Sequence, residues 1–242
     1  MKTTMVIPTY NESENLEKLA AEVFALPLED LHILIVDDNS PDGTGELAEE
    51  LGKKYNGRIH VMHRPGKQGL GTAYNQGFRL AMEEGADFIG QMDADFSHPI
   101  EKIPEMVEKA KEYDYVIGSR YVKGGKLDEN WPWTRKLLSG FGNFYARTIL
   151  GLKNRDVTGG FKIWRKETLQ AMPLDRIKAN GFMFQVEMNY VANRLGMTVC
   201  EIPIYFKDRE AGKSKMSFDI KKEAALKTWG LRSRYKDLKP IK

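Results

Sequence analysis

The chain has 242 residues, 41% of them hydrophobic and 29% charged, and a net charge of +3. These values predict a water-soluble globular protein with one large domain, or one domain plus a short appendage. They argue against a membrane-spanning protein, because the longest apolar runs, such as residues 33–36, fall far short of the ~20 residues of a span. No apolar leader is predicted, and the single Cys200 excludes an internal disulfide and fits a reducing cytosol.

Positive charge is concentrated near the C-terminal end. Residues 207–242 contain twelve Lys or Arg and five Asp or Glu, a net charge of +7, which leaves −4 for the rest of the chain. Such a segment is expected to meet an anionic surface or phosphate groups, or else to be a solvated charged helix. No nucleic-acid-binding signature accompanies the charge, so nucleic acid is not predicted as a partner.

The first half of the chain alternates short apolar strands with amphipathic helices. The first helix, which is expected to run to about residue 27, can be capped by Asn11 or Ser13. Five strand–helix alternations predict an α/β fold with a mainly parallel sheet and helices on both faces. The strands are predicted at 5–7, 31–36, 59–62, 88–92 and 115–118, and the later helices near 44–51, 73–84 and 99–112.

The second half is more aromatic and less regular. In the segment 131–150, Phe141, Phe144 and Tyr145 are spaced to share one face. That face is expected to pack into the core, and the alternative is a surface that meets acyl chains or a partner. A helix is predicted at 182–195, and a closing helix at 218–231. A last strand is predicted at 199–206, where Pro203 indicates a sheet edge or a bulge.

Two carboxylates follow the predicted strand at 88–92. Asp93 and Asp95 fall where open α/β sheets collect their ligands, at the carboxyl ends of parallel strands. Two carboxylates so close together repel each other unless a cation lies between them. A Mg²⁺ ion shared with substrate phosphate oxygens fits that need. The alternative is that Asp95 caps the next helix while Asp93 is solvated.

Residues 66–73 resemble a phosphate-binding loop. They lack the final glycine of the dinucleotide-binding motif and the terminal Gly-Lys-Ser/Thr of a P-loop, which disfavours an ATPase or an NAD enzyme of the usual type. The backbone amides of this loop either meet a pyrophosphate or form a plain tight turn.

Several stretches, taken together, resemble the inverting family 2 glycosyltransferases with the Rossmann-like GT-A fold. They are residues 6–12, 36–44, 93–95 and 158–161. Within that family, residues 92–99, 118–121, 184–187, 206–209 and 212–215 are most similar to the dolichol-phosphate or polyprenol-phosphate mannose synthases. The resemblance extends from residue 3 to about residue 220. It implies a GT-A domain at 1–215, with a nucleotide-sugar half at about 1–120 and an acceptor half at about 121–215. The remaining residues, 216–242, are expected to form a basic amphipathic helix and tail.

The resemblance also implies an activity and its site. The reaction is inverting transfer of mannose from GDP-mannose to the phosphate of a membrane polyprenol such as dolichyl phosphate, with Mg²⁺ or Mn²⁺ as cofactor. Catalytic positions of the family match Asp93, Asp95, Arg120, Arg135 and Arg209, and the three arginines match the positions that bind the acceptor phosphate. Metal-binding positions match Asp93, Asp95 and Ser97, and some relatives carry glutamine at the last one. Substrate-binding positions match Pro8, Tyr10, Glu12, Val36, Asp37, Asp38, Lys67, Ala94, Ser139, Gln185 and Lys213.

Several relatives carry transmembrane helices at the C-terminus, and this sequence contains none. The resemblance therefore implies a cytoplasmic protein attached peripherally to the cytoplasmic face of a membrane, or held there by a small membrane-anchoring subunit.

Two other functions stay open on the sequence. A family 2 enzyme that uses another nucleotide sugar or a glycan hydroxyl acceptor would need a carboxylate base, for which Asp156 and Glu187 are the candidates. A non-catalytic subunit that binds nucleotide-sugar and regulates a partner would need none of this machinery. The aspartate pair and the arginines argue against that second function.

Overall fold

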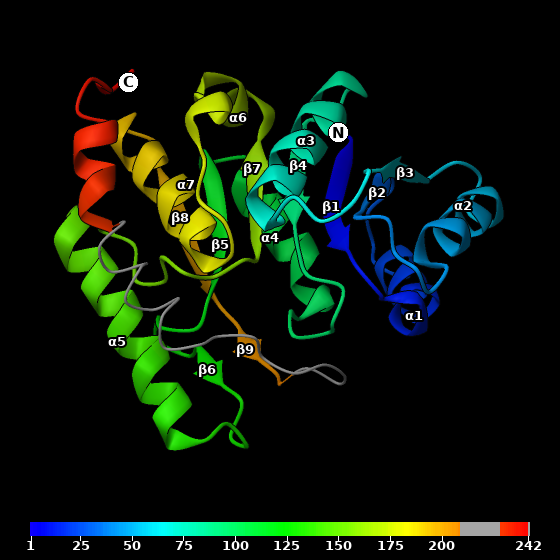
Figure 1. Cartoon of the computed structure of the whole chain (residues 1–242), viewed down its shortest axis with the longest axis horizontal. Coiled ribbons are helices and arrows are strands. Elements are labelled where there is room, and N and C mark those ends of the chain that lie inside the picture. Colours follow the sequence, from blue (N-terminus) through cyan, green and yellow to red (C-terminus); the bar gives the residue numbers. More distant parts are fainter. Residues whose placement is uncertain (209–227, 242) are drawn as a thin grey trace.

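A seven-stranded sheet with helices on both faces forms the centre of the protein (Figure 1). The structure is a computed structural model that describes residues 1–208 and 228–241. The strands follow the order β3-β2-β1-β4-β7-β5-β8. They are β1 (Thr3–Thr9), β2 (Leu31–Asp37), β3 (Ile59–His63), β4 (Phe88–Gln91), β5 (Tyr115–Ser119), β7 (Lys162–Arg165) and β8 (Val199–Pro203). Two short strands, β6 (Lys126–Leu127) and β9 (Tyr205–Phe206), pair separately.

The helices divide into two layers. On one face lie α3 (Leu70–Glu83), α5 (Trp133–Leu150), α6 (Lys166–Ala171), α7 (Phe182–Arg194) and a helical segment at 228–234. On the other lie α1 (Ser13–Phe24), α2 (Thr44–Lys54) and α4 (Ile103–Ala110). The predicted α/β fold, with a mainly parallel sheet covered on both faces, is confirmed.

The apolar runs of the strands produce two cores because successive side chains point to opposite faces. In β1, Val6 packs in the core under α3, whereas Met5 and Ile7 pack in the core under α1. Gly77 allows α3 to approach the sheet closely, since a Cβ there would lie 2.4 Å from Cγ1 of Val6. Both layers hold the sheet rigidly beneath the loops at its carboxyl edge.

Strand β7 was not predicted from the sequence. It runs antiparallel between β4 and β5, so these two strands are not neighbours and the sheet is mixed. Only four residues long, with Lys162 and Arg165 at its ends, it shows no apolar run. The last predicted strand, 199–206, is two strands: β8 lies at the edge of the large sheet and ends at Pro203, and β9 pairs with β6. The edge position indicated by Pro203 is confirmed.

Neither Asn11 nor Ser13 caps α1, contrary to expectation. The N-cap is Glu12, and it makes no capping bond through its side chain. Instead, the carboxylate of Asp42 accepts hydrogen bonds from the backbone N–H of Ser13 (3.1 Å) and of Thr44 (3.1 Å), the first residues of α1 and α2. The helix predicted at 99–112 begins as a 3₁₀ turn, Ile100–Lys102, and becomes α4 at Ile103.

The expectation that Phe141 and Phe144 pack into the core is wrong. Both are 61% exposed, and α5 buries Asn143, Ala146 and Leu150 instead. Most of the predicted closing helix, and the boundary at 215/216, lie outside the described residues. In the described ranges 1–208 and 228–241, no helix combines the length and the apolar character needed to cross a membrane.

Candidate active site

The carboxyl ends of β1, β2, β4 and β5 share one edge of the sheet, since these strands run in the same direction. The loops after them carry most of the predicted site residues, as expected for an open α/β sheet. They are residues 10–12 after β1, 38–42 after β2, 93–97 after β4, and Arg120 directly after β5, while Asp37 is the last residue of β2.

Tyr10 and Lys67 come from different loops and meet. The ammonium of Lys67 lies 3.2 Å from the centroid of the Tyr10 ring, within the range of a cation–π contact. Glu12 lies next to them in the chain; its backbone N–H donates to Thr44 Oγ1 (3.0 Å) and its carboxylate accepts from Asn15 Nδ2 (2.8 Å). The loop 66–69 therefore faces the loop after β1, which supports a ligand-facing loop rather than a plain turn.

Asp38 is tied to the same loop by Arg64, which sequence reasoning missed. Nη1 of the buried Arg64 lies 2.5 Å from Oδ1 of Asp38, and its Nη2 donates to Thr72 Oγ1 (2.6 Å) near the start of α3. Burial raises the pKa of Asp38 even though Arg64 lies beside it. Arg64 could have been suspected only from its place directly after β3, level with Asp37 and Asp38.

Four predicted substrate-binding residues present little of their side chains to the site. They are Pro8, Val36, Asp37 and Ala94. Asp37 is buried and accepts hydrogen bonds from Thr9 Oγ1 (3.1 Å) and from Ser40 N (2.9 Å), which joins the loops after β1 and β2. The side chains of Val36 and Ala94 lie in the core, so these residues can face a ligand only through their backbone. Pro8 is half-buried and pairs with Val36 across the strands.

The Asp93–Ser97 segment turns sharply. Phe96 has a φ of 58°, the left-handed region that aromatic residues rarely adopt, and such backbone outliers gather at functional sites. Asp95 Oδ1 accepts from Ser97 N (3.1 Å), while Asp93 N donates to His98 Nδ1 (3.1 Å). The alternative that Asp95 caps the next helix is wrong, because neither the 3₁₀ turn nor α4 has a side-chain cap.

These residues fit a hard divalent cation. Ser97 is buried and its Oγ finds no hydrogen-bond partner in the described part of the chain, a costly state that a cation would relieve. Two carboxylates and a hydroxyl are the oxygen ligands that Mg²⁺ and Mn²⁺ prefer. Among the described residues no group of three or more His, Cys, Asp or Glu could hold a metal.

A buried polar network lies beneath the aspartates. Lys162, on β7, is fully buried and donates to Gly159 O (2.6 Å) and to Gln185 Oε1 (2.5 Å). Gln185 Oε1 also accepts from Gln91 Nε2 (2.7 Å). Burial lowers the pKa of Lys162 to about 7, partly opposed by the negative charge of Asp156. Gln185 is therefore placed under the site by two side chains, and Lys162 is a site residue that the sequence analysis missed.

Arg120 forms a buried ion pair. Its Nε and Nη2 donate to the two carboxylate oxygens of Asp156, and Nη2 also reaches Thr158 Oγ1 (2.7 Å). Burial alone would raise the pKa of Asp156, but Arg120 outweighs it and the pKa is lowered. The hydrogen bonds that the side chain of Arg120 donates to described residues come from Nε and Nη2.

Phe206 joins the aspartates to the arginines. Its ring lies 5.4 Å from the ring of His98, 5.8 Å from the ring of Trp131 and 5.3 Å from the guanidinium carbon of Arg120. Arg135, on the first turn of α5, lies 3.6 Å from the Trp131 ring and donates to Asp208 (2.9 Å). We call Arg120, Phe206, Trp131 and Arg135 the cationic row. It brings two predicted acceptor arginines to one strip beside Asp93.

Ser139 lies on α5 and connects to the same strip. Its Oγ is 2.8 Å from the hydroxyl of Tyr121, whose ring lies 5.3 Å from the guanidinium carbon of Arg120. Arg209 and Lys213 lie outside the described residues, so their predicted roles stay predictions.

The carboxylates of the two candidate bases, Asp156 and Glu187, already accept hydrogen bonds from neighbouring residues. Asp156 accepts from Arg120 and also from Gly159 N (2.9 Å). Glu187 is fully buried and accepts from Arg234 (2.7 Å) and from Tyr235 (2.9 Å), which anchors the helical segment at 228–234. Neither carboxylate can take a proton from a hydroxyl acceptor without breaking the contacts that hold it.

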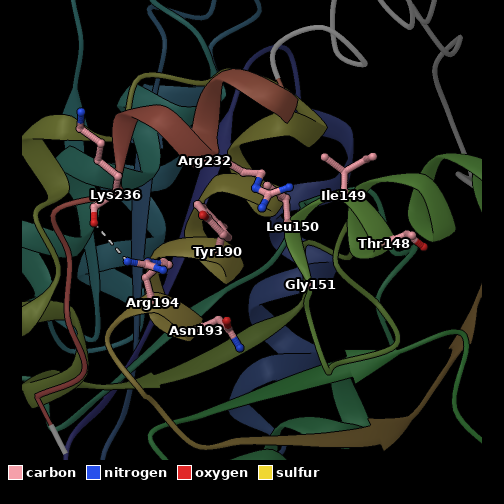
Figure 2. Close-up of a pocket in the computed structure, with 9 residues that line it drawn as sticks. All are labelled: Thr148, Ile149, Leu150, Gly151, Tyr190, Asn193, Arg194, Arg232 and Lys236. Carbon is pink, nitrogen blue, oxygen red and sulfur yellow. Dashed lines mark hydrogen bonds between the residues drawn. The ribbon is translucent and has the colours of Figure 1, made fainter.

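A separate pocket of about 430 Å³ lies at the C-terminal ends of α5 and α7 (Figure 2). It is roughly 20 Å along the axis of α5 from Arg135. Arg194 in its wall donates to the backbone carbonyls of Lys236 (3.3 Å) and Leu238 (2.6 Å), which fastens the chain end to α7. None of its lining residues is a predicted site residue. They are Thr148, Ile149, Leu150, Gly151, Tyr190, Asn193, Arg194, Arg232 and Lys236.

Comparison with known proteins shows the family of this chain. The family model of glycosyl transferase family 2 matches residues 4–172. The chain therefore belongs to glycosyltransferase family 2. It is 44% identical to an undecaprenyl-phosphate mannosyltransferase of Micrococcus luteus, over 99% of this chain and 98% of that protein. It is also 44% identical to a polyprenol monophosphomannose synthase of Mycolicibacterium smegmatis, over 96% of this chain and 88% of that protein.

A solved structure shares the fold at low sequence identity. Glucosyl-3-phosphoglycerate synthase from Mycobacterium tuberculosis, crystallised with Mn²⁺, UDP and glucosyl-3-phosphoglycerate, has a TM-score of 0.65 and 16% identity. The match covers 96% of this chain and 79% of that one. The likeness shows that the fold is that of the GT-A enzymes.

Proposed function

We propose that this protein transfers mannose from GDP-mannose to the phosphate of a membrane polyprenol, with inversion, to give a β-mannosyl phosphoryl lipid. One observation carries the proposal: the cationic row lies beside the aspartate pair, and the nearby carboxylates are occupied. An acceptor that arrives already ionised needs arginines and no base. The names of the two full-length relatives, which specify mannose and a polyprenyl phosphate, support the same reaction.

The nucleoside binds at the loops after β1 and β2. Tyr10 supplies an aromatic face, and the carboxylates of Glu12 and Asp38 accept hydrogen bonds from guanine or ribose. Asp37 holds the two loops in register through Thr9 and Ser40. Lys67 lies over Tyr10 and meets the diphosphate with its positive charge.

Asp93, Asp95 and Ser97 hold Mg²⁺ or Mn²⁺. The buried, unpartnered hydroxyl of Ser97 and the paired carboxylates support this assignment, as does the Mn²⁺ in the structural relative. When bound, the ion offsets the negative charge that develops on the leaving diphosphate. The ring of His98 accepts a hydrogen bond from the backbone N–H of Asp93 and so helps to position the residue that carries this carboxylate.

Arg120 and Arg135 bind the acceptor phosphate, assisted by Ser139 and, by resemblance, Arg209. An oxygen of that phosphate attacks C1 of mannose on the face opposite GDP. The C1–O bond to GDP breaks, and its electron pair leaves with the diphosphate, so the anomeric configuration inverts. The arginine charges overcome the repulsion between the two phosphate groups. Gln185 and Lys162 support the floor of the site from below.

The protein acts at the cytoplasmic face of a membrane, because its acceptor lies there. Radiolabelled GDP-mannose and UDP-glucose, each supplied with a short polyprenyl phosphate and Mg²⁺, test the proposal. We expect label from GDP-mannose in a lipid product that mild acid releases as mannose. Transfer from UDP-glucose alone, or equally fast transfer to an unphosphorylated polyprenol, would overturn it.

A further inference from the structure

An irregular segment, residues 174–180, lies along one side of α3. Near the end of the helix, Arg79 donates to the carboxylate of Asp175 (2.7 Å). One turn earlier, the amide of Asn75 donates to the carbonyl oxygen of Ile177 (3.3 Å). The order of these contacts shows that the segment runs antiparallel to α3, from the end of the helix toward its start.

The same segment reaches the first turn of α3 and packs tightly there. A Cβ added at Gly71 would come within 3.0 Å of the carbonyl oxygen of Ala179. One added at Gly69 would come within 3.0 Å of the side chain of Asn180. Only glycine permits so close an approach. The backbone at 179 and 180 therefore limits where the loop 66–69 and the start of α3 can lie.

The loop at this contact is the one that faces the loop after β1. Lys67 lies over the ring of Tyr10 at 3.2 Å. The next residue, Gln68, accepts from Nη2 of the buried Arg64 (3.2 Å). A shift of the backbone at 178–180 would thus be passed to the loop that carries Lys67.

One buried carboxylate, that of Glu187 on α7, holds the end of the segment. Its Oε2 accepts from the backbone N–H groups of Lys178 (3.0 Å) and Ala179 (2.7 Å). Its Oε1 accepts from Arg234 (2.7 Å) and Tyr235 (2.9 Å). The two oxygens therefore hold different parts of the chain: Oε2 holds the segment beside α3, and Oε1 holds the C-terminal segment.

A carboxylate suits this position because each of these four groups donates to it. Burying a charge costs free energy unless its oxygens are hydrogen-bonded, and both oxygens of Glu187 are. Hydrogen bonds from N–H groups to an ionised acceptor are also stronger than those between neutral groups. They act here on backbone at 178–180 that belongs to no helix or strand. Without Glu187 that backbone would lose contacts that fix it beside Gly71.

We infer that Glu187 is a positioning residue for the donor site: by fixing the backbone at 178–180, it holds the loop 66–69 in the arrangement that binds a nucleoside diphosphate. The identity of that ligand rests on the proposed function. Glu187 acts through the segment and Gly71, not by contact with the ligand. Its loss leaves the loop correctly placed in only a fraction of molecules, and the apparent donor affinity falls by that fraction. Once the donor is bound, the loop is in place, so kcat at saturating donor changes little.

Calorimetry of GDP binding in Mn²⁺, together with kcat and KM for GDP-mannose, tests the inference on the full chain. For Glu187→Ala we expect GDP binding about tenfold weaker, a matching rise in KM, and kcat within about twofold of wild type. Arg234→Ala is the matched control, because it disturbs the same carboxylate at the other oxygen, and its GDP affinity should stay within about twofold of wild type. Glu187→Gln keeps an acceptor oxygen for the two backbone N–H groups and should recover most of the affinity that Glu187→Ala loses.

Gly71→Ala tests the same contact from α3 and keeps Glu187, so it serves if Glu187→Ala does not fold. Its Cβ would meet the carbonyl oxygen of Ala179, whereas a Cβ at Gly142 on α5 would meet nothing within 4 Å. We expect Gly71→Ala to weaken GDP binding about tenfold and its control, Gly142→Ala, to leave GDP binding unchanged.

Three outcomes overturn the inference: a GDP affinity of Glu187→Ala within about twofold of wild type, an equal loss of affinity in Arg234→Ala, or a fall in kcat with KM unchanged. Failure of the proposed function gives a different result. If wild type binds UDP and not GDP, the proposed donor falls, and the same contrast between Glu187→Ala and Arg234→Ala, measured with UDP, supports or overturns the positioning role.

Discussion

Arg120 holds Asp156 through two parallel hydrogen bonds, Nε to Oδ2 and Nη2 to Oδ1, each 2.8 Å long. The same carboxylate accepts the backbone N–H of Arg120 (3.0 Å), so it fixes the arginine at both ends. The two side chains are 9% and 0% exposed. Nε and Nη2 of Arg120 are therefore committed to contacts that hold the fold.

The buried ion pair predicts different phenotypes for Arg120 and Arg135, the two described arginines that we propose bind the acceptor. Arg120→Ala leaves a buried, unpaired carboxylate and should lower the free energy of unfolding by roughly 3–5 kcal/mol. Arg135 pairs with Asp208 at a partly exposed position, where loss of the pair costs about 1 kcal/mol or less. Urea denaturation of both variants measures the contrast. Equal destabilisation would contradict the assignment of Arg120 to a structural pair.

Arg135→Ala should instead act on the acceptor. Loss of a charged hydrogen bond to phosphate is expected to reduce kcat/KM for polyprenyl phosphate by about 10- to 100-fold. Calorimetry should give a GDP-mannose affinity within about twofold of wild type, because the donor loops lie elsewhere on the sheet edge. If the affinity for GDP-mannose falls as much as kcat/KM for polyprenyl phosphate, Arg135 does not act specifically on the acceptor.

The aspartate pair predicts loss of transfer without loss of fold. Asp95→Asn and Asp93→Asn should each lower kcat by on the order of 10²-fold or more, since each removes a negative charge that would hold the metal ion, and that ion would offset the charge of the departing diphosphate. Asp93 is only partly buried, and at the buried position 95 an asparagine keeps a side-chain oxygen that can accept from Ser97 N, so thermal unfolding should change little. Mn²⁺ binding, followed by electron paramagnetic resonance in the presence of GDP, should weaken in both variants. Near-wild-type turnover in Mg²⁺ would remove the metal assignment.

The sequence analysis succeeded where the signal is local. Buried parallel strands such as β1 and β2 are continuous apolar runs, and the polar residues after them necessarily share one edge of the sheet. Asp93 and Asp95 could therefore be placed at the site from the strand pattern, whereas Tyr10 and Asp38 were assigned to it by resemblance. The grouping of Arg120 with Arg135 rested on resemblance, because the residues between them, 121–134, are mostly irregular chain with the short strand β6 and the start of α5.

It failed where long-range contacts decide. Strand β7 is short and ends in charged residues, and only its neighbours β4 and β5 make it a strand. A lysine such as Lys162 is expected at the surface, but the sheet buries it against Gln185. The spacing of Phe141 and Phe144 indicates an apolar side of a helix. Helix α5 has apolar residues on two sides, however, and their spacing alone does not show which side packs against the core.

Burial of Lys162 predicts a pH dependence of stability. Its pKa falls from 10.5 to about 7 on folding, so between these values the unfolded chain binds more protons than the native protein does. The contribution of Lys162 to the free energy of unfolding therefore rises with pH. Relative to Lys162→Met, wild type should gain roughly 2 kcal/mol between pH 7 and pH 9, since each pKa unit corresponds to about 1.4 kcal/mol. Urea denaturation at both pH values measures the change, and Lys153→Met controls for loss of one exposed lysine. If the difference in free energy of unfolding between wild type and Lys162→Met does not depend on pH, the lowered pKa of Lys162 is contradicted.

Asp42 links the first two helices and predicts the opposite pH behaviour. Its carboxylate accepts the first backbone N–H of α1 and of α2, where the positive ends of both helix dipoles favour a negative charge. Burial alone would raise its pKa, but the hydrogen bonds from Thr44 and Ser13 outweigh it and lower the pKa to about 2.

A carboxyl group with a depressed pKa stabilises the native state above its unfolded pKa of 3.8 and loses that contribution as the pH falls through about 2. Asp42→Ala should therefore cost on the order of 1 kcal/mol at pH 7, the usual effect of losing a helix cap. The cost should shrink between pH 6 and pH 3, as wild type loses stability that the variant never had. Asp42→Asn keeps an acceptor oxygen without the charge. Its free energy of unfolding at pH 7 should therefore lie between those of wild type and Asp42→Ala. Urea denaturation across this range measures all three proteins. A cost for Asp42→Ala that stays constant down to pH 3 would show that the charge of Asp42 contributes nothing and that only its shape matters.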